Sequence, residues 1–184
     1  MRQFLIVTFA AAGIAAGLIG CDNSTKETAA AKSDAAQPAE ALPASLIATT
    51  RPSGAAIDVV AAKKSAKDGQ PVVVRGRIGA QKEPLAANRA IMTIADDSLP
   101  TCDKTPMKAC STPWDSCCEP HDELAAKSAT VQVVGADGRP LKATLKGAGG
   151  MKPGSEVVVA GTAKVPPGGG DSLIIEASQI YVTP

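Results

Sequence analysis

The chain has 184 residues, of which 45% are hydrophobic and 20% are charged, and its 19 Lys and Arg nearly balance its 18 Asp and Glu. A formal net charge of +1 excludes a strongly basic nucleic-acid binder and an acidic solvating tail, and the length excludes a large multidomain enzyme. Aromatic residues are scarce, because after Phe4 and Phe9 the chain has only Trp114 and Tyr181. A folded core therefore has to be built from Val, Ile, Leu and Ala.

The first 20 residues have the layout of a secretory signal. Arg2 supplies one positive charge, and an uncharged, largely apolar run follows over residues 4–19. This run is shorter than the roughly 20 apolar residues that a transmembrane helix needs, and the polar residues Asp22 and Asn23 come soon after it. We expect residues 1–20 to be a signal peptide that directs export and is then removed.

The end of this segment resembles the lipobox of bacterial lipoproteins, since residues 18–21 read LIGC. The resemblance implies that Cys21 carries diacylglycerol, that the chain is cut before it, and that the new N-terminus is acylated. Each buried CH₂ contributes about 0.8 kcal/mol, so several acyl chains hold a protein at a membrane without spanning it. The expected location is the cell envelope, facing the periplasm or the exterior. A soluble secreted protein with an incidental Cys21 and an uncleaved N-terminal helix are the alternatives, and the choice between inner and outer membrane stays open.

Residues 21–50 are predicted to form a flexible linker behind the lipid anchor. They are rich in Ala, Ser, Thr, Lys, Glu and Pro, with hardly any large apolar residue before Leu42. Such a composition buries too little surface to offset an ordering cost of about 1–2 kcal/mol per residue. Residues 51–184 are then expected to form one folded domain.

This domain begins with a predicted helix and two predicted strands. Helical spacing of apolar residues covers residues 57–67, and Asp68 and Gly69 end it. Residues 70–78 (QPVVVRGRI) and 90–95 (AIMTIA) alternate between two faces, as strands do. In the first strand one face carries Val72, Val74, Gly76 and Ile78, and the other carries Val73, Arg75 and Arg77.

Two hairpins are predicted in the second half. Residues 130–134 and 141–145 flank Asp137-Gly138, a dipeptide typical of two-residue hairpin turns because both central positions need positive φ. Residues 156–163 and 173–182 flank a Pro- and Gly-rich loop. Between the hairpins, the Gly-rich residues 147–154 are expected to hold one turn of helix.

Five or six short strands within this length predict a mainly β domain, a small closed or half-closed barrel with a short N-terminal helix. The pattern resembles an OB-fold, in which a long first strand bends at a glycine, the place that Gly76 takes here. An immunoglobulin-like sandwich is the competing hypothesis, and it is disfavoured because it needs about seven strands.

A long loop is the most informative segment. Residues 96–127 lack clear periodicity and carry Cys102, Cys110, Cys117 and Cys118, together with Trp114 and the only histidine, His121. In an exported protein an even cysteine count favours disulfides, here two. A bond between neighbouring cysteines is strained, so we expect Cys117 and Cys118 each to pair with Cys102 or Cys110. Trp114 is expected to pack over these cross-links and close one end of the barrel.

A metal site is the alternative hypothesis. Cys102, Cys110, Cys117 or Cys118, and His121 offer the soft ligands that Zn²⁺ or Cu⁺ prefers. The gaps of seven, six and zero residues between the cysteines differ from the paired C-x₂-C arrangement of structural zinc sites. A reactive or redox thiol pair is a third hypothesis.

No motif for hydrolysis or nucleotide use is present: the chain lacks G-x-S-x-G, H-E-x-x-H, G-x-x-x-x-G-K-[ST] and G-x-G-x-x-G. We therefore predict a non-enzyme. Arg75, Arg77, Lys82 and Arg89 are interpreted as a solvated strand face, because the aromatic platforms that single-stranded nucleic acid needs are missing. The expected function is a lipid-anchored binding or interaction module without a cofactor, whose partner is an unknown envelope protein or small ligand; metal handling (Zn or Cu) or thiol redox chemistry at the cysteine-rich loop is the alternative.

Overall fold

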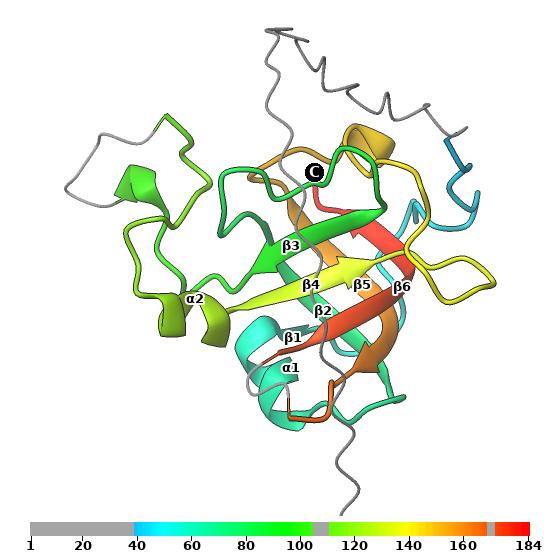
Figure 1. Ribbon diagram of the computed structural model, residues 1–184, viewed down its shortest axis with the longest axis horizontal. Coiled ribbons are helices and arrows are strands. Elements are labelled where there is room, and N and C mark those ends of the chain that lie inside the picture. The colour runs from blue at the N-terminus through cyan, green and yellow to red at the C-terminus, as the bar shows by residue number, and fades with distance from the viewer. Residues whose placement is uncertain (1–38, 105–110, 169–171) are drawn as a thin grey trace, which may run out of the picture. The chain divides into compact units, whose positions relative to one another are not determined.

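The computed structural model describes residues 39–104, 111–168 and 172–184 (Figure 1). The predicted signal peptide, the lipidation site Cys21, most of the predicted linker and Cys110 lie outside the described residues. The linker prediction is wrong for residues 39–50, because Leu46 is 1% exposed in the barrel core and the backbone of Leu46 and Ala48 is hydrogen-bonded to Ile180 of the last strand. Within the described residues no helix is both long enough and apolar enough to cross a membrane.

The described elements follow the chain in this order: β1 (Ile57–Asp58), α1 (Val59–Ser65), β2 (Pro71–Ile78), β3 (Ile91–Ala95), the 3₁₀ turn η1 (Cys102–Lys104), α2 (His121–Ala126), β4 (Ser128–Gln132), the 3₁₀ turn η2 (Ala148–Gly150), β5 (Glu156–Lys164) and β6 (Ile174–Val182).

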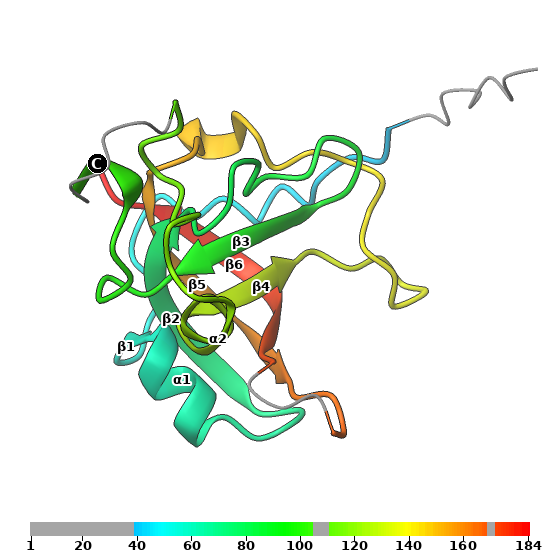
Figure 2. The same ribbon diagram turned by 60° about the vertical axis from the view of Figure 1, so that its left-hand side comes forward.

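The strands form a closed barrel. They are ordered β1-β2-β3-β4-β6-β5, and pairing between β2 and β5 closes the ring, which leaves β1 as an extra strand beside β2 (Figure 1). Neighbours in the ring are antiparallel except for β4 and β6, which are parallel. Figure 2 shows α1 next to β2 and α2 next to the start of β4. The small OB-like barrel predicted from the sequence is confirmed.

Aliphatic side chains fill the barrel, as the alternation along the strands predicts. Val74, Gly76 and Ile78 of β2 are buried, and so are Met92 and Ile94 of β3. No aromatic side chain belongs to the core among the described residues. Burial of such side chains stabilises the fold by about 25 cal/mol per Å² of apolar surface.

Gly76 is a position where the barrel tolerates no side chain. A Cβ built there would lie 2.8 Å from the Ala95 carbonyl oxygen and 3.2 Å from a methyl group of Val59. Real Cβ atoms essentially never come within 3.0 Å of another heavy atom, so β3 or α1 would have to move. Close approach of β3 and α1 is therefore a reason for glycine in the middle of β2.

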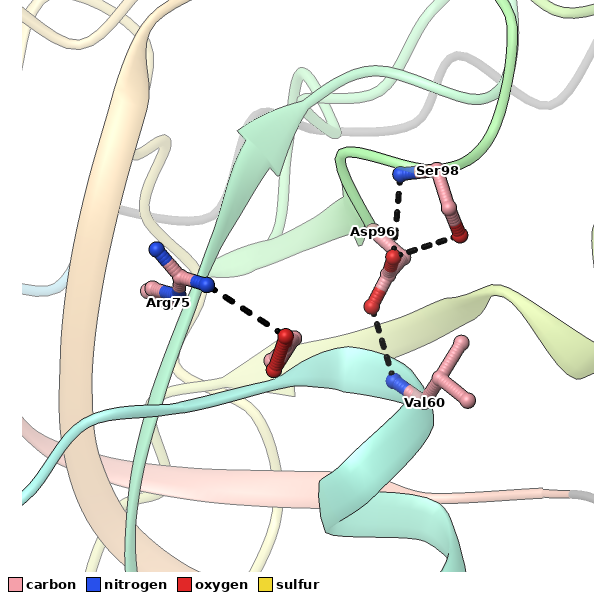
Figure 3. A network of polar contacts seen from close by, with 5 residues as sticks. Val60, Arg75, Asp96 and Ser98 are labelled. Atoms are coloured by element: carbon pink, nitrogen blue, oxygen red, sulfur yellow. Dashed lines mark hydrogen bonds and ion pairs between the residues drawn. The ribbon is translucent and has the colours of Figure 1, made fainter.

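The expected helix is present as α1, but residues 57–58 are extended and pair with β2. Asp58 holds the N-cap position without a side-chain cap, and Asp96, beyond the end of β3, supplies the cap instead. One Asp96 carboxylate oxygen accepts a hydrogen bond from the Val60 N–H at 2.9 Å, and the other accepts bonds from the Ser98 N–H and hydroxyl (Figure 3). Asp96 thereby ties the helix to the start of the long loop.

This cap predicts a pH-dependent contribution to stability. Burial raises the pKa of Asp96, but the hydrogen bonds from Val60 and Ser98 outweigh burial and hold the pKa below its ordinary value. A carboxyl group whose pKa is lower in the folded state stabilises the fold above its unfolded-state pKa of about 4, and this contribution is lost as the pH falls through the folded-state pKa. Asp96→Asn should therefore lower the free energy of unfolding by about 1 kcal/mol at pH 7, and by less at pH 3.

Urea unfolding at a series of pH values measures this effect. Its matched control is Asp97→Asn, an exposed neighbour whose change should stay within about 0.5 kcal/mol. A difference between Asp96→Asn and the parent that does not vary with pH would contradict the role of the charge.

The strand predicted at residues 141–145 is wrong. A turn is present, but it is not the expected two-residue turn, because Gly138 has φ of +74° whereas Asp137 has no positive φ. The Gly135 N–H donates to the Arg139 carbonyl, the Gly138 N–H donates to the Gly135 carbonyl, and the Leu141 N–H donates to the Val133 carbonyl, so residues 136–138 form a three-residue loop. Beyond Leu141 the segment has no ladder to join, because β4 pairs with β3 on one edge and with β6 on the other. The second predicted hairpin, β5 with β6, and the helical turn in the Gly-rich connection, η2, are present.

Candidate functional site

The loop between β3 and β4 folds back onto the barrel and has a small core of its own. Leu99, which is 1% exposed, packs with Ala80 and Ala95, and Leu124 of α2 covers them. The sequence pattern did not predict α2, because a six-residue helix is too short for a periodic signal. Part of the loop is thus held in place by packing.

Trp114 fastens the loop to one end of the barrel, where β2 ends and β5 begins. Its indole N–H donates to the Lys82 carbonyl at 3.1 Å, and its own carbonyl lies so close to Gly79 that a Cβ there would be 2.7 Å away. Next to this contact Ala80 has φ of +72°, a conformation that costs a non-glycine residue about 1–2 kcal/mol. The backbone is therefore strained where the loop docks.

Two cysteine-bearing segments of the loop lie side by side. The Cys102 N–H donates to the Asp115 carbonyl at 2.8 Å, and the Ser116 hydroxyl donates to the Pro100 carbonyl at 2.7 Å. Asp115 and Ser116 are both buried, and the Asp115 carboxylate accepts a hydrogen bond from the Ser116 N–H. These bonds fix the position of Cys102 relative to Cys117.

The sulfur atoms of Cys102 and Cys117 are 3.3 Å apart. This is a contact distance, since a disulfide bond is about 2.05 Å long. Cys118 lies next to them, and the three sulfurs are all within 4.8 Å of one another, Cys102 being buried and the other two exposed. The pairing predicted for Cys117 includes this partner, whereas Cys110 lies outside the described residues.

His121 is not part of this group of ligands among the described residues. It is the exposed first residue of α2. The three sulfurs alone have spacing suited to a soft metal, because Zn–S bonds of about 2.3 Å place ligand sulfurs roughly 3.8 Å apart. A tetrahedral zinc site would need a fourth ligand, and a Cu⁺ site would need only the thiolates.

A groove of about 260 Å³ lies beside the same loop. Its walls include Trp114 and Pro113 from one cysteine-bearing segment, and Thr101 and Lys104 from the other. The groove is also lined by Arg77 of β2, Asp103, Pro153 and Gly154. A hydrogen bond from Thr101 holds the pKa of Asp103 below its ordinary value, so this carboxylate stays charged.

Comparison with known proteins leaves the chemistry of this site as the guide to function. The chain has no significant match to a protein-family model, a curated protein or a solved structure.

The sequence pattern indicated Trp114 and the cysteines as site residues, but it did not predict the groove, and it placed Arg77 on a solvated face. Arg77 is in fact half-buried, because the loop folds over the end of β2.

Proposed function

We propose that this protein is a lipid-anchored binding module of the cell envelope, and that the cysteine-bearing loop forms its binding surface. The observation that carries the proposal is the contact between the Cys102 and Cys117 sulfur atoms. These residues lie in two loop segments that backbone and side-chain hydrogen bonds join. The same two segments form walls of the groove at Trp114. A rigid loop on a small barrel suits binding, since recognition residues commonly lie on loops that a rigid scaffold positions.

Cross-links are the proposed source of this rigidity. In an oxidising compartment two thiols held 3.3 Å apart form a disulfide, so the first bond joins Cys102 to Cys117. The count of cysteines then assigns Cys118 to Cys110. Cys21 takes no part, because its sulfur carries the lipid.

The experiment is the intact mass and the thiol content of the protein purified from the envelope fraction. The mass should lack residues 1–20 and include added acyl chains. Thiol titration should find no reactive thiol, with or without denaturant and chelator. The matched variant Cys21→Ala should remain unprocessed or leave the membrane, while its loop cysteines stay unreactive.

Three results would contradict this proposal in separate ways. A mass that retains Met1 without lipid would remove the anchor. Four thiols that react only after denaturation and chelation would establish the second candidate function, metal handling. That candidate is favoured by a specific observation, the three sulfurs within 4.8 Å of one another, and Zn²⁺ or Cu⁺ would be the metal. Thiols that react without chelator would instead support a redox pair.

A further inference from the structure

Arg77 is a half-buried cation with few partners. Its only hydrogen bond to a described residue runs from Nη2 to the Leu99 carbonyl at 3.3 Å, and its Nε is buried without a partner. Guanidinium groups have five donors in a planar fork, and buried donors without partners are costly. Much of the hydrogen-bonding capacity of Arg77 is therefore left unused by the described residues.

Arg75, two positions earlier on the same strand, provides the comparison. Its side chain is 54% exposed, and it forms an ion pair with Asp58 at 3.3 Å (Figure 3). Arg77 has no carboxylate within ion-pair distance in the part of the chain that the structure describes. Of these two arginines, the less exposed one thus lacks a carboxylate partner among the described residues.

The described charged residues that line the groove around Arg77 have a net positive charge. Lys104 and Asp103 also line it, and Lys104 is among the causes that lower the pKa of Asp103, so these two charges largely offset each other. The charge of Arg77 remains. An oxyanion entering the groove would supply the missing counter-charge and accept hydrogen bonds from two guanidinium nitrogens at once.

The other walls are flat and largely apolar. The Trp114 ring is held by its hydrogen bond to Lys82, and Pro113 and Pro153 add aliphatic ring surface. Aromatic rings and flat apolar groups stack on such surfaces. The volume of about 260 Å³ is below the range of 300–1,000 Å³ that is usual for drug-sized ligands, so the groove suits a single small ring.

We infer that this groove binds a small ring-bearing oxyanion, with the carboxylate or phosphate on the Arg77 guanidinium and the ring against Trp114. This inference rests on the proposed binding function and specifies its ligand class. Because Thr101 and Lys104 flank Cys102 closely and Trp114 lies near Cys117, the proposed disulfide also holds the two walls of the groove together.

Trp114 makes the test direct, since it is the only tryptophan of the chain and its fluorescence reports on the groove. The detergent-extracted protein is titrated with benzoate, with phenyl phosphate, and with uncharged benzamide as the matched probe. We expect a saturable change in Trp114 emission with at least one of the two anions, and none with benzamide at the same concentrations. Arg77→Gln should raise the Kd for that anion at least about tenfold, because hydrogen bonds to a charged group are lost.

The control is Arg75→Gln, which removes the same charge from the same strand and should leave the Kd within about twofold, because this arginine is exposed and paired. Lys104→Gln is the second variant. Lys104 is exposed, so its replacement should leave the fold intact and still tests the groove if Arg77→Gln does not fold. Lys104→Gln should weaken anion binding about two- to threefold. Equal effects of Arg75→Gln and Arg77→Gln, equal binding of benzamide, or no saturable change with either anion would overturn the inference. This titration does not depend on the lipid mass or the thiol count, so its failure is distinguishable from failure of the proposed function.

Discussion

Replacing Gly76 by valine should prevent the barrel from closing, or lower the free energy of unfolding by about 3 kcal/mol or more. The added side chain would start 2.8 Å from the Ala95 carbonyl oxygen, and backbone cannot move aside as a flexible side chain can. Gly76 also pairs with Val157 of β5, so a shift of β2 away from β3 would disturb the ladder that closes the barrel. Overpacking of a dense core, which forces side chains off their rotamers and shifts the backbone, costs about 1–3 kcal/mol and occasionally more.

Urea unfolding and the near-ultraviolet spectrum of the single tryptophan measure this effect. Gly76→Ala should fall between the parent and Gly76→Val, because it adds the Cβ alone. The control Thr93→Val places valine at a half-buried position of β3 without adding bulk, because threonine and valine have the same branched shape; it loses one exposed hydrogen bond from Gln81 and should change stability by less than about 1 kcal/mol. A Gly76→Val protein with the unfolding midpoint of the parent would show that the close contact is not a constraint.

Loss of the proposed bond between Cys102 and Cys117 should be the second large effect. The two residues are 15 positions apart, and closing a loop of this length stabilises a protein by about 3 kcal/mol. Cys102→Ala and Cys117→Ala should each lower the free energy of unfolding by about this amount. The double variant should lose little more than either single variant, because the same bond is broken only once.

Cys118→Ala is the matched variant that separates the two chemistries. If Cys102 and Cys117 form a disulfide, the cost of Cys118→Ala adds to the cost of either partner's replacement. If the three sulfurs share a metal ion, all three replacements are non-additive, and a chelator reproduces their effect in the parent. Additive costs for Cys102→Ala and Cys117→Ala would contradict both.

Local sequence pattern was sufficient for elements whose faces differ in polarity. β2 and β3 alternate between the core and the outside, and the pattern located both to within one residue. β5 and β6 were found in the same way, and with them the strand count that points to a barrel. A turn at Asp137-Gly138 was predicted in the right place because its chemistry is local, but only Gly138 has the positive φ that was expected of both residues. The same local signal suggested a strand at residues 141–145 that the fold does not form.

The sequence by itself determined the barrel as a fold class and the loop as the segment that holds the cysteines, while the export signal stays a prediction. Only the tertiary structure decided which groups lie together: Asp96 with the start of α1, Cys102 with Cys117, and Arg77 in the same groove as Trp114. The reason is that periodicity records which face of an element is buried, whereas contacts between distant segments depend on how the ladders pair and on where a non-periodic loop docks. β4 is hydrogen-bonded to a strand on each of its two edges, β3 and β6. The long loop folds onto the end of β2 and partly covers Arg77, which the strand pattern alone assigns to solvent.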